Sequence, residues 1–287
     1  MRSAAEKRQA LKAALAGPEI VLAPSCVDPV TARLVQRMGL PAVHASGSVA
    51  HRVMGYADAG ILTMNEMVDR LLALEDTVDL PVIADADTGF GNVVNVVRTI
   101  KEYERAGAAA IHIEDQETPK KPLHQGVEGG VISRKEMVNK IRAAVDARTD
   151  EGFVIIARSE VKGDLQEVID RLAECCEAGA DAAWAAGGDA ESVGAMRKAI
   201  KKPLIGVLPR GATAQQYQEW GANCAVLPGA LQIAALYAQQ KVLEELKRTG
   251  TAAGYFASLH GIEEMQTFYN RQGNAELEDV EKRFGGG

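Results

Sequence analysis

Short apolar runs alternate with longer amphipathic segments along almost the whole chain. The runs with the length and composition of buried strands are residues 20–23, 42–45, 82–84, 110–113, 154–157, 182–184, 204–207 and 224–227. Between them, apolar residues recur every three to four positions, as they do on one face of a helix. The helix candidates are residues 29–38, 65–79, 92–106, 134–147, 165–178, 190–200, 214–220 and 230–248. This alternation predicts an α/β fold built on a parallel sheet.

Eight strand–helix pairs with short returns are what a (β/α)₈ barrel requires. Several predicted helices end in a glycine that supplies a left-handed cap before the next strand: Gly39, Gly107, Gly179 and Gly221. A doubly wound open sheet shows the same alternation. However, no Gly-x-Gly-x-x-Gly opens a helix after a first strand, and polar motifs follow several different strands. We therefore expect an α/β (β/α)₈ TIM barrel with an additional C-terminal helical segment.

We expect the barrel to occupy residues 1–250 and the helical tail residues 251–287. Within the tail, residues 255–270 predict one helix, and residues 276–283 form a charged end. Aromatic and aliphatic side chains such as Tyr255, Phe256 and Phe268 give this tail too much apolar surface to remain uncovered. It is therefore expected to pack on its own barrel or on a neighbouring subunit.

Composition excludes some classes of partner. The 287 residues carry a formal charge of −7, which argues against binding to nucleic acid or to an anionic membrane. No apolar run reaches the roughly 18 residues of a membrane-spanning helix, and the N-terminus predicts an amphipathic helix rather than a secretory signal. The four cysteines have neither zinc-type spacing nor a disulfide framework, so we expect reduced thiols and a cytoplasmic location.

Two strand candidates end in carboxylates. The run 82–91, Val-Ile-Ala-Asp-Ala-Asp-Thr-Gly-Phe-Gly, places Asp85 and Asp87 at its end, and the run 111–115, Ile-His-Ile-Glu-Asp, places Glu114 there. Side chains alternate along a strand, so Asp85 and Asp87 are expected on one face. Helix capping or ion pairing is the alternative role for such residues. Three converging carboxylates would oppose one another's ionisation unless a cation is present. Hard divalent cations such as Mg²⁺ prefer oxygen ligands of this kind, which predicts a metal site.

Two further motifs follow predicted strands. Arg158 ends the fifth strand, and its planar guanidinium matches a carboxylate or a phosphonate. The alternative is a salt bridge to Glu160 or to a metal-site acid. The run Ser46-Gly47-Ser48 follows the second strand, where small residues let backbone N–H groups approach an anionic oxygen closely.

The segment 116–130 is long, polar and rich in glycine, and it contains Lys120, Lys121 and His124. A loop of this kind between a barrel strand and its helix is a candidate lid over the barrel mouth. Its lysines and histidine would reach a substrate only when the lid closes. A solvated surface loop is the alternative. Among the other polar residues, His112 is expected to be buried in the barrel, Trp184 to be a packing residue, and His51 remains undecided.

Taken in order, these motifs resemble the isocitrate lyase/phosphoenolpyruvate mutase superfamily from about residue 24 to residue 246. The resemblance rests on the following segments: 45–47 (Ala-Ser-Gly), 56–58 (Tyr-Ala-Asp), 85–91, 113–116 (Ile-Glu-Asp-Gln), 119–121 (Pro-Lys-Lys), 133–137 (Ser-Arg-Lys-Glu-Met) and 156–158 (Ile-Ala-Arg). It implies a (β/α)₈ barrel and Mg²⁺, with Mn²⁺ as an alternative. It also implies a homo-oligomer that is a dimer of dimers with exchanged C-terminal helices, and a small 2-oxo or 2-hydroxy carboxylate as substrate.

Specific roles follow from the same resemblance. It implies that Asp85, Asp87 and Glu114 hold the metal, with Asp58 contributing through water. It also implies that Ser46, Gly47 and Ser48 cradle the substrate carboxylate and that Arg158 clamps it. The shared chemistry is stabilisation of an enolate of pyruvate or a related 2-oxo acid while a C–C or P–C bond breaks.

Several positions depart from the family pattern. The lyase branch has Lys-Lys-Cys-Gly-His or Lys-Arg-Cys-Gly-His in the lid, and that Cys protonates the enolate. Residues 120–124 here read Lys-Lys-Pro-Leu-His, and Pro122 has no ionisable group. His44 stands where lyases often have Tyr, and Glu160 replaces the usual Asp. The segment 206–210 matches neither branch, and its Arg210 is either a reader of a second anionic group or a surface residue.

These observations predict a Mg²⁺-dependent lyase that acts on a small dicarboxylate through a pyruvate-type enolate. Decarboxylation of oxaloacetate suits the absent Cys, because water can protonate the enolate left when CO₂ departs. Retro-aldol cleavage of an alkyl-malate or methylisocitrate-like acid would instead use His124 or the lid lysine Lys120. The alternatives are P–C chemistry on a phosphonopyruvate and a non-catalytic protein that binds 2-oxo acids.

Overall fold

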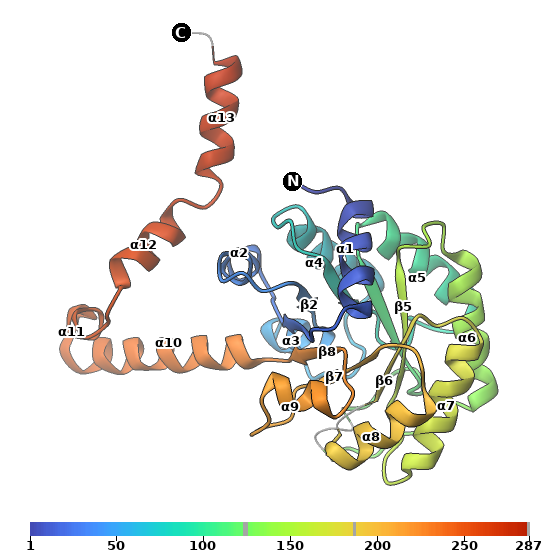
Figure 1. Cartoon of the computed structure of the whole chain (residues 1–287). Coiled ribbons are helices and arrows are strands. Elements are labelled where there is room, and N and C mark those ends of the chain that lie inside the picture. Colours follow the sequence, from blue (N-terminus) through green and yellow to red (C-terminus); the bar gives the residue numbers. More distant parts are fainter. Residues whose placement is uncertain (123–125, 186–187, 286–287) are drawn as a thin grey trace. The chain divides into compact units, whose positions relative to one another are not determined.

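The computed structural model describes residues 1–122, 126–185 and 188–285 (Figure 1). The chain forms two compact units, Met1–Ala230 and Leu231–Gly287. The division falls earlier than the expected boundary at residue 250, because the long helix α10 (Ala230–Thr249) groups with the C-terminal unit.

The first unit contains one sheet of eight parallel strands. They are β1 (Val21–Pro24), β2 (Val43–Ala45), β3 (Val82–Asp85), β4 (Ala110–Glu114), β5 (Val154–Ser159), β6 (Ala182–Ala185), β7 (Leu204–Val207) and β8 (Cys224–Leu227). Their order in the sheet is β1-β8-β7-β6-β5-β4-β3-β2. A parallel bridge between Ser25 and His44 joins the two end strands, so the barrel is nearly closed. The expected barrel is confirmed, with every strand within two residues of its predicted bounds.

Helices α4 to α8 lie on the outer side of the strands (Figure 1). The helices of the first unit are α1 (Ala4–Ala16), α2 (Pro29–Arg37), α3 (Gly47–Val53), α4 (Met64–Glu75), α5 (Val93–Arg105), α6 (Arg134–Ala147), α7 (Leu165–Glu177), α8 (Ala190–Ala199) and α9 (Ala214–Glu219). The short helix α3 was not predicted, because its seven residues give little periodicity. The helix predicted for residues 65–79 ends earlier, at Glu75.

The amphipathic N-terminal helix becomes part of the barrel core. Leu11 and Leu15 of α1 join a buried cluster of strand side chains that includes Ile83, Ile156 and Trp184. Burying this helix also buries Lys7 and Arg8, which are 2% and 6% exposed. Each of these cations has a partner within 2.8 Å, as buried charges require.

The second unit is entirely helical and contains α11 (Ala253–Ala257), α12 (Ile262–Asn270) and α13 (Asn274–Phe284) after α10. The prediction of a single helix over residues 255–270 is wrong. Gly261 has left-handed backbone angles at the N-cap of α12 and separates it from α11. The charged end lies in α13. Within the described residues, no helix is long and apolar enough to cross a membrane.

Lys7 and Glu75 form a buried ion pair whose loss can be measured. Lys7 Nζ lies 2.7 Å from Glu75 Oε2, and burial raises the pKa of the Glu75 carboxyl to about 7. Lys7→Met leaves that carboxylate buried without its partner, which is expected to lower the free energy of unfolding at pH 8 by about 3 kcal/mol. At pH 5 the unpaired carboxyl takes up a proton and the loss shrinks. Urea unfolding at both pH values measures the difference.

Lys12→Met, on an exposed position of the same helix, is the matched control and is expected to change stability by less than about 0.5 kcal/mol. An equal loss for Lys7→Met at pH 5 and pH 8 would show that the destabilisation does not come from an uncompensated carboxylate.

Candidate functional site

The predicted metal-site carboxylates converge at the carboxyl ends of neighbouring strands. Asp85 is the last residue of β3 and Glu114 the last residue of β4, and Glu114 pairs in register with Arg158 of β5. Asp58, Asp85, Asp87 and Glu114 are each 5% exposed or less. Helix capping does not account for them, because the N-caps of the following helices are Asn92 and Ser133.

Asp85 is held by backbone N–H groups from two elements. Its Oδ2 accepts a hydrogen bond from the N–H of Gly47 (2.8 Å), and its Oδ1 accepts one from the N–H of Asp87 (3.0 Å). Strand alternation does not place Asp87, since β3 ends at Asp85 and Asp87 has a left-handed backbone (φ 47°). That part of the prediction is wrong, although both carboxylates reach the same site. The turn after β3, rather than the strand itself, directs the Asp87 carboxylate toward the site.

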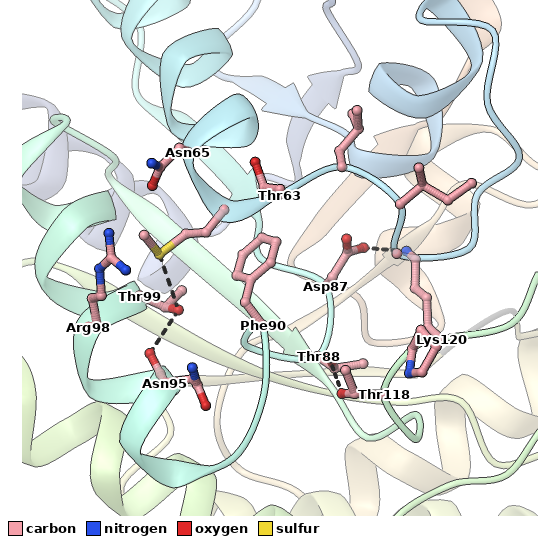
Figure 2. Close-up of a pocket in the computed structure, with 15 residues that line it drawn as sticks. Thr63, Asn65, Asp87, Thr88, Phe90, Asn95, Arg98, Thr99, Thr118 and Lys120 are labelled. Carbon is pink, nitrogen blue, oxygen red and sulfur yellow. Dashed lines mark hydrogen bonds and ion pairs between the residues drawn. The ribbon is translucent and has the colours of Figure 1, made fainter.

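Lys120, a predicted catalytic residue, lies among the carboxylates. Its Nζ is 2.9 Å from Asp58 Oδ1 and 3.7 Å from Glu114 Oε1, and it forms a still closer ion pair with Asp87 (Figure 2). The side chain is only 5% exposed. Burial disfavours its charge, but the surrounding carboxylates hold the pKa of Lys120 well above its usual value. The base of the candidate lid therefore supplies a cation to the carboxylate cluster.

The carboxyl groups respond differently to burial. Burial opposes the ionisation of Asp85, yet the attraction of His112, Lys120 and Arg158 holds the pKa of Asp85 below its usual range. Burial raises the pKa of Asp87 despite the attraction of Lys120. Burial also raises the pKa of Glu114 to about 7, against the attraction of Lys120 and Arg158. The positive charge of Lys120 is thus too small to keep every carboxyl group of the cluster readily ionised.

The donor set fits a divalent cation. Asp87 Oδ2 and Glu114 Oε2 are buried and accept no hydrogen bond from any described residue. Carboxylate oxygens grouped in this way are the preferred ligands of Mg²⁺ and Mn²⁺, and a cation there would favour the ionised form of each acid. A second grouping, His44, Asp85 and His112, brings one possible ligand atom from each residue within 4.8 Å of the others. Asp85 belongs to both.

Arg158 is already paired within the protein. Its Nε donates to Glu160 Oε1 (2.7 Å), its Nη2 lies 3.5 Å from Glu114 Oε2, and its guanidinium sits 4.9 Å from the centre of the Trp184 ring. The salt-bridge alternative therefore describes this structure. Trp184, expected only to pack, also positions the guanidinium through a cation–π contact.

The Ser46–Ser48 run starts helix α3. Ser46 is its N-cap and its Oγ lies 3.2 Å from Ser48 Oγ. Sequence reasoning left His51 undecided, and the structure gives it a role in holding this segment. Its Nδ1 bonds to Gly47 O (2.8 Å), and its Nε2 accepts from the N–H groups of Ile61 and Leu62, both at 3.1 Å. His51 lies four residues after Gly47, and this spacing brings the two together only on a helix. Because α3 was not predicted, the sequence alone did not reveal the contact.

The neck of the candidate lid is a short antiparallel pairing. Gln116 bridges to Val131, and the N–H of Glu117 donates to Gly130 O (3.0 Å). Pro122 is buried, whereas His124 lies outside the described residues. Arg210 is exposed in the turn after β7, and no residue in the described part of the chain forms an ion pair with it. The structure thus brings Lys120 to the site, whereas the role of Arg210 stays a prediction.

A cavity of about 460 Å³ opens beside the cluster (Figure 2). It shares Asp87 and Lys120 with the carboxylate site and is also lined by Phe90, Arg98 and Thr118. Thr88 Oγ1 and Thr118 Oγ1 are 2.7 Å apart and connect the β3 loop to the lid base. A small molecule therefore has room next to the carboxylates.

Comparison with known proteins gives consistent matches over nearly the whole chain. A family model described as phosphoenolpyruvate phosphomutase matches residues 11–247. The 2,3-dimethylmalate lyase of Eubacterium barkeri is 35% identical over 301 aligned positions that cover 100% of both chains. A phosphoenolpyruvate phosphomutase structure from Streptomyces platensis subsp. rosaceus has a TM-score of 0.90 at 30% identity, covering 99% of this chain and 100% of that one. A phosphonopyruvate hydrolase solved with oxalate and Mg²⁺ has a TM-score of 0.86 at 31% identity, with 98% and 99% covered.

The close approach of α3 to the cluster allows a test of the metal site. A Cβ added to Gly47 would lie 2.8 Å from Asp85 Oδ2 and 3.0 Å from its Cγ, so Gly47→Ala displaces the Asp85 carboxylate. We expect the affinity for Mg²⁺, measured by isothermal titration calorimetry, to fall by about tenfold or more.

Gly194→Ala is the matched control, because a Cβ on this helical glycine meets nothing within 4 Å. It is expected to leave Mg²⁺ affinity unchanged. Wild-type affinity in Gly47→Ala would mean that Asp85 does not hold the cation in the position inferred from this structure.

Proposed function

Since the chain belongs to the phosphoenolpyruvate mutase/isocitrate lyase superfamily, we propose that it is a Mg²⁺-dependent carbon–carbon lyase for a small 2-oxo or 2-hydroxy dicarboxylate. The observation that carries the proposal is the buried set of four carboxylates at the strand ends, with Lys120 among them and Arg158 beside them. The similarity to 2,3-dimethylmalate lyase over the whole chain supports a lyase activity.

The chain's own residues supply binding and charge. Asp85 would hold Mg²⁺, with Asp58, Asp87 and Glu114 completing its surroundings. When bound, the cation would supply Lewis-acid stabilisation of negative charge on the 2-oxo oxygen of the substrate. Arg158 would bind a substrate carboxylate in place of Glu160, and Ser46, Gly47 and Ser48 would hydrogen-bond to it, with the Gly47 N–H shared between the substrate and Asp85. These donors lie at the ends of different strands, where they can hold the substrate while its charge is redistributed.

The lid limits which bond breaks most readily. In decarboxylation of oxaloacetate the C–C bond to the carboxylate breaks, CO₂ leaves, and the electron pair forms the enolate of pyruvate, which then takes a proton from water. Pro122 cannot give that proton, and none is needed from the lid. Retro-aldol cleavage of a substituted malate requires a base for the 2-hydroxyl and an acid for the departing carbon. His124 and Lys120 are the candidate groups for these roles.

P–C bond cleavage in a phosphonopyruvate is the second candidate. It is favoured by the TM-scores of 0.90 and 0.86 to the phosphomutase and the phosphonopyruvate hydrolase. The same carboxylate cluster and Arg158 would serve, since the phosphonate group, like the carboxylate, matches the planar fork of Arg158. The family resemblance implies an Asn or Thr-Asn after the lysine in a mutase or hydrolase lid, whereas Pro122 follows the lysines here.

A substrate panel tests the proposal. Purified protein with Mg²⁺ is expected to release pyruvate or a related 2-oxo acid from oxaloacetate, 2,3-dimethylmalate or 2-methylisocitrate, followed by coupled reduction of the product. Turnover of phosphonopyruvate alone would assign P–C chemistry. No turnover, with oxalate raising the melting temperature only in the presence of Mg²⁺, would assign a binding protein instead.

Two substitutions test the mechanism. Asp85→Asn is expected to lower kcat/KM by at least about 10³-fold, because it removes the carboxylate that the N–H groups of Gly47 and Asp87 hold in place. Pro122→Cys is expected to raise retro-aldol turnover, because it restores an ionisable group at that position of the lid. Steady-state kinetics on the best substrate of the panel measure both, and undiminished turnover in Asp85→Asn would sink the metal-assisted mechanism.

We also propose that the helical tail (residues 251–287), together with α10, packs on a neighbouring subunit in a homotetramer. Ile233, Leu236, Tyr237 and Leu243 form an apolar stripe on α10, and their side chains are 62–65% exposed. Exposed apolar stripes of this kind are typical of protein–protein interfaces. Light scattering coupled to size-exclusion chromatography is expected to give the mass of a tetramer for the full chain, and Leu236→Glu with Tyr237→Glu is expected to lower it. A monomeric wild-type chain would contradict this.

A further inference from the structure

Two histidines lie in contact inside the barrel, directly behind the carboxylate site. His44 of β2 and His112 of β4 are 2% and 0% exposed, and their Nε2 atoms are 3.1 Å apart. On the far side, His44 Nδ1 is 2.9 Å from Ser25 Oγ. On the near side, His112 Nδ1 faces Asp85 Oδ1 at 3.6 Å. The four side chains form a continuous row from Ser25 to Asp85.

The chemistry of the row fixes its hydrogens. The Nε2 atoms of His44 and His112 are close enough for a hydrogen bond, so one of these two nitrogens donates and the other accepts. Asp85 is an anion, and a lone pair facing it would be repelled, so the hydrogen of His112 is on Nδ1. His112 Nε2 then accepts, His44 Nε2 donates, and Ser25 donates to His44 Nδ1. Every donor in the row points toward Asp85.

The row leaves one group without a hydrogen bond. His112 Nδ1 is buried and has no hydrogen-bond partner in the described residues, and Asp85 Oδ1 is the oxygen it faces. At 3.6 Å in a low-dielectric interior, an N–H dipole still attracts a carboxylate strongly. Trp184 packs edge-on against His112, with ring centres 4.5 Å apart, and limits the movement of the imidazole. The His112 ring, whose position is fixed by Trp184, therefore orients the Asp85 carboxylate.

We propose that His44 is a positioning residue, which acts through His112 to orient the Asp85 carboxylate and so sets the affinity of the site for a divalent cation. The proposal rests on the proposed function in that it takes Asp85 as a metal ligand. Hydrogen-bonding partners behind metal ligands commonly contribute about 10- to 100-fold to metal affinity. No described contact joins His44 to Asp87, Glu114 or Lys120. The effect of His44 on metal affinity therefore has to pass through His112.

Removing and restoring the donor at position 44 tests the proposal. His44→Phe keeps an aromatic ring but cannot donate to His112 Nε2, and it is expected to weaken Mg²⁺ and Mn²⁺ binding by about tenfold or more, measured by calorimetry and by Mn²⁺ electron paramagnetic resonance. His44→Gln offers an amide N–H in a similar place and is expected to regain most of that affinity. At saturating metal, the KM for substrate is expected to stay near the wild-type value.

Val43→Ala is the matched control, because Val43 is a buried neighbour on the same strand but is not part of the row. It is expected to lower the melting temperature without changing metal affinity. Equal affinities for wild type, His44→Phe and His44→Gln would overturn the proposal, and so would equal weakening in Val43→Ala. Should His44→Phe fail to fold, an affinity for His44→Gln as low as that of Gly47→Ala would also overturn it. A wild-type protein that binds neither cation would instead overturn the proposed function as well.

Discussion

Four carboxylates are buried together where strands β3 and β4 end, and the rest of the site is arranged to make that possible. Asp58, Asp85, Asp87 and Glu114 share one lysine, with one arginine at the edge. Burying like charges is costly unless cations and hydrogen-bond donors compensate. The protein provides Lys120 from the lid base, Arg158 from β5, and backbone N–H groups from α3 and the β3 loop. A divalent cation would supply the positive charge that remains missing.

That constraint accounts for local features that look unrelated in the sequence. Gly47 has no side chain because Asp85 Oδ2 occupies the place of a Cβ. Asp87 takes a left-handed backbone, uncommon outside glycine, so that its N–H reaches Asp85 while its carboxylate reaches Lys120. His51 uses both ring nitrogens to fix α3, which carries the Gly47 N–H. Each feature keeps an anion in place or places a donor beside it.

The same constraint connects the site to the lid. Lys120 belongs to the candidate lid, so its ion pairs also connect the base of that segment to the carboxylate cluster. The altered part begins two residues later, at the buried Pro122. The candidate lid therefore supplies a cation to the site, but Pro122 provides no ionisable group at the position where the family resemblance implies a Cys. The chemistry proposed for this chain follows from that combination.

The alternation of apolar runs and amphipathic helices determined the α/β class, because strand and helix periods are local properties that each segment carries by itself. The polar motifs after several different strands then favoured the barrel over an open sheet. The carboxylates were likewise visible, since a buried strand tolerates charge at its end only where that end meets a cleft or a compensating cation. Only the tertiary structure decided where Asp87 points and where Lys120 lies. It also decided that Arg158 pairs with Glu160 and that a row of side chains runs from Ser25 to Asp85. Those contacts depend on strand register, on a turn with positive φ and on the approach of α3, and most of them join residues far apart in the chain. No local pattern encodes these distances.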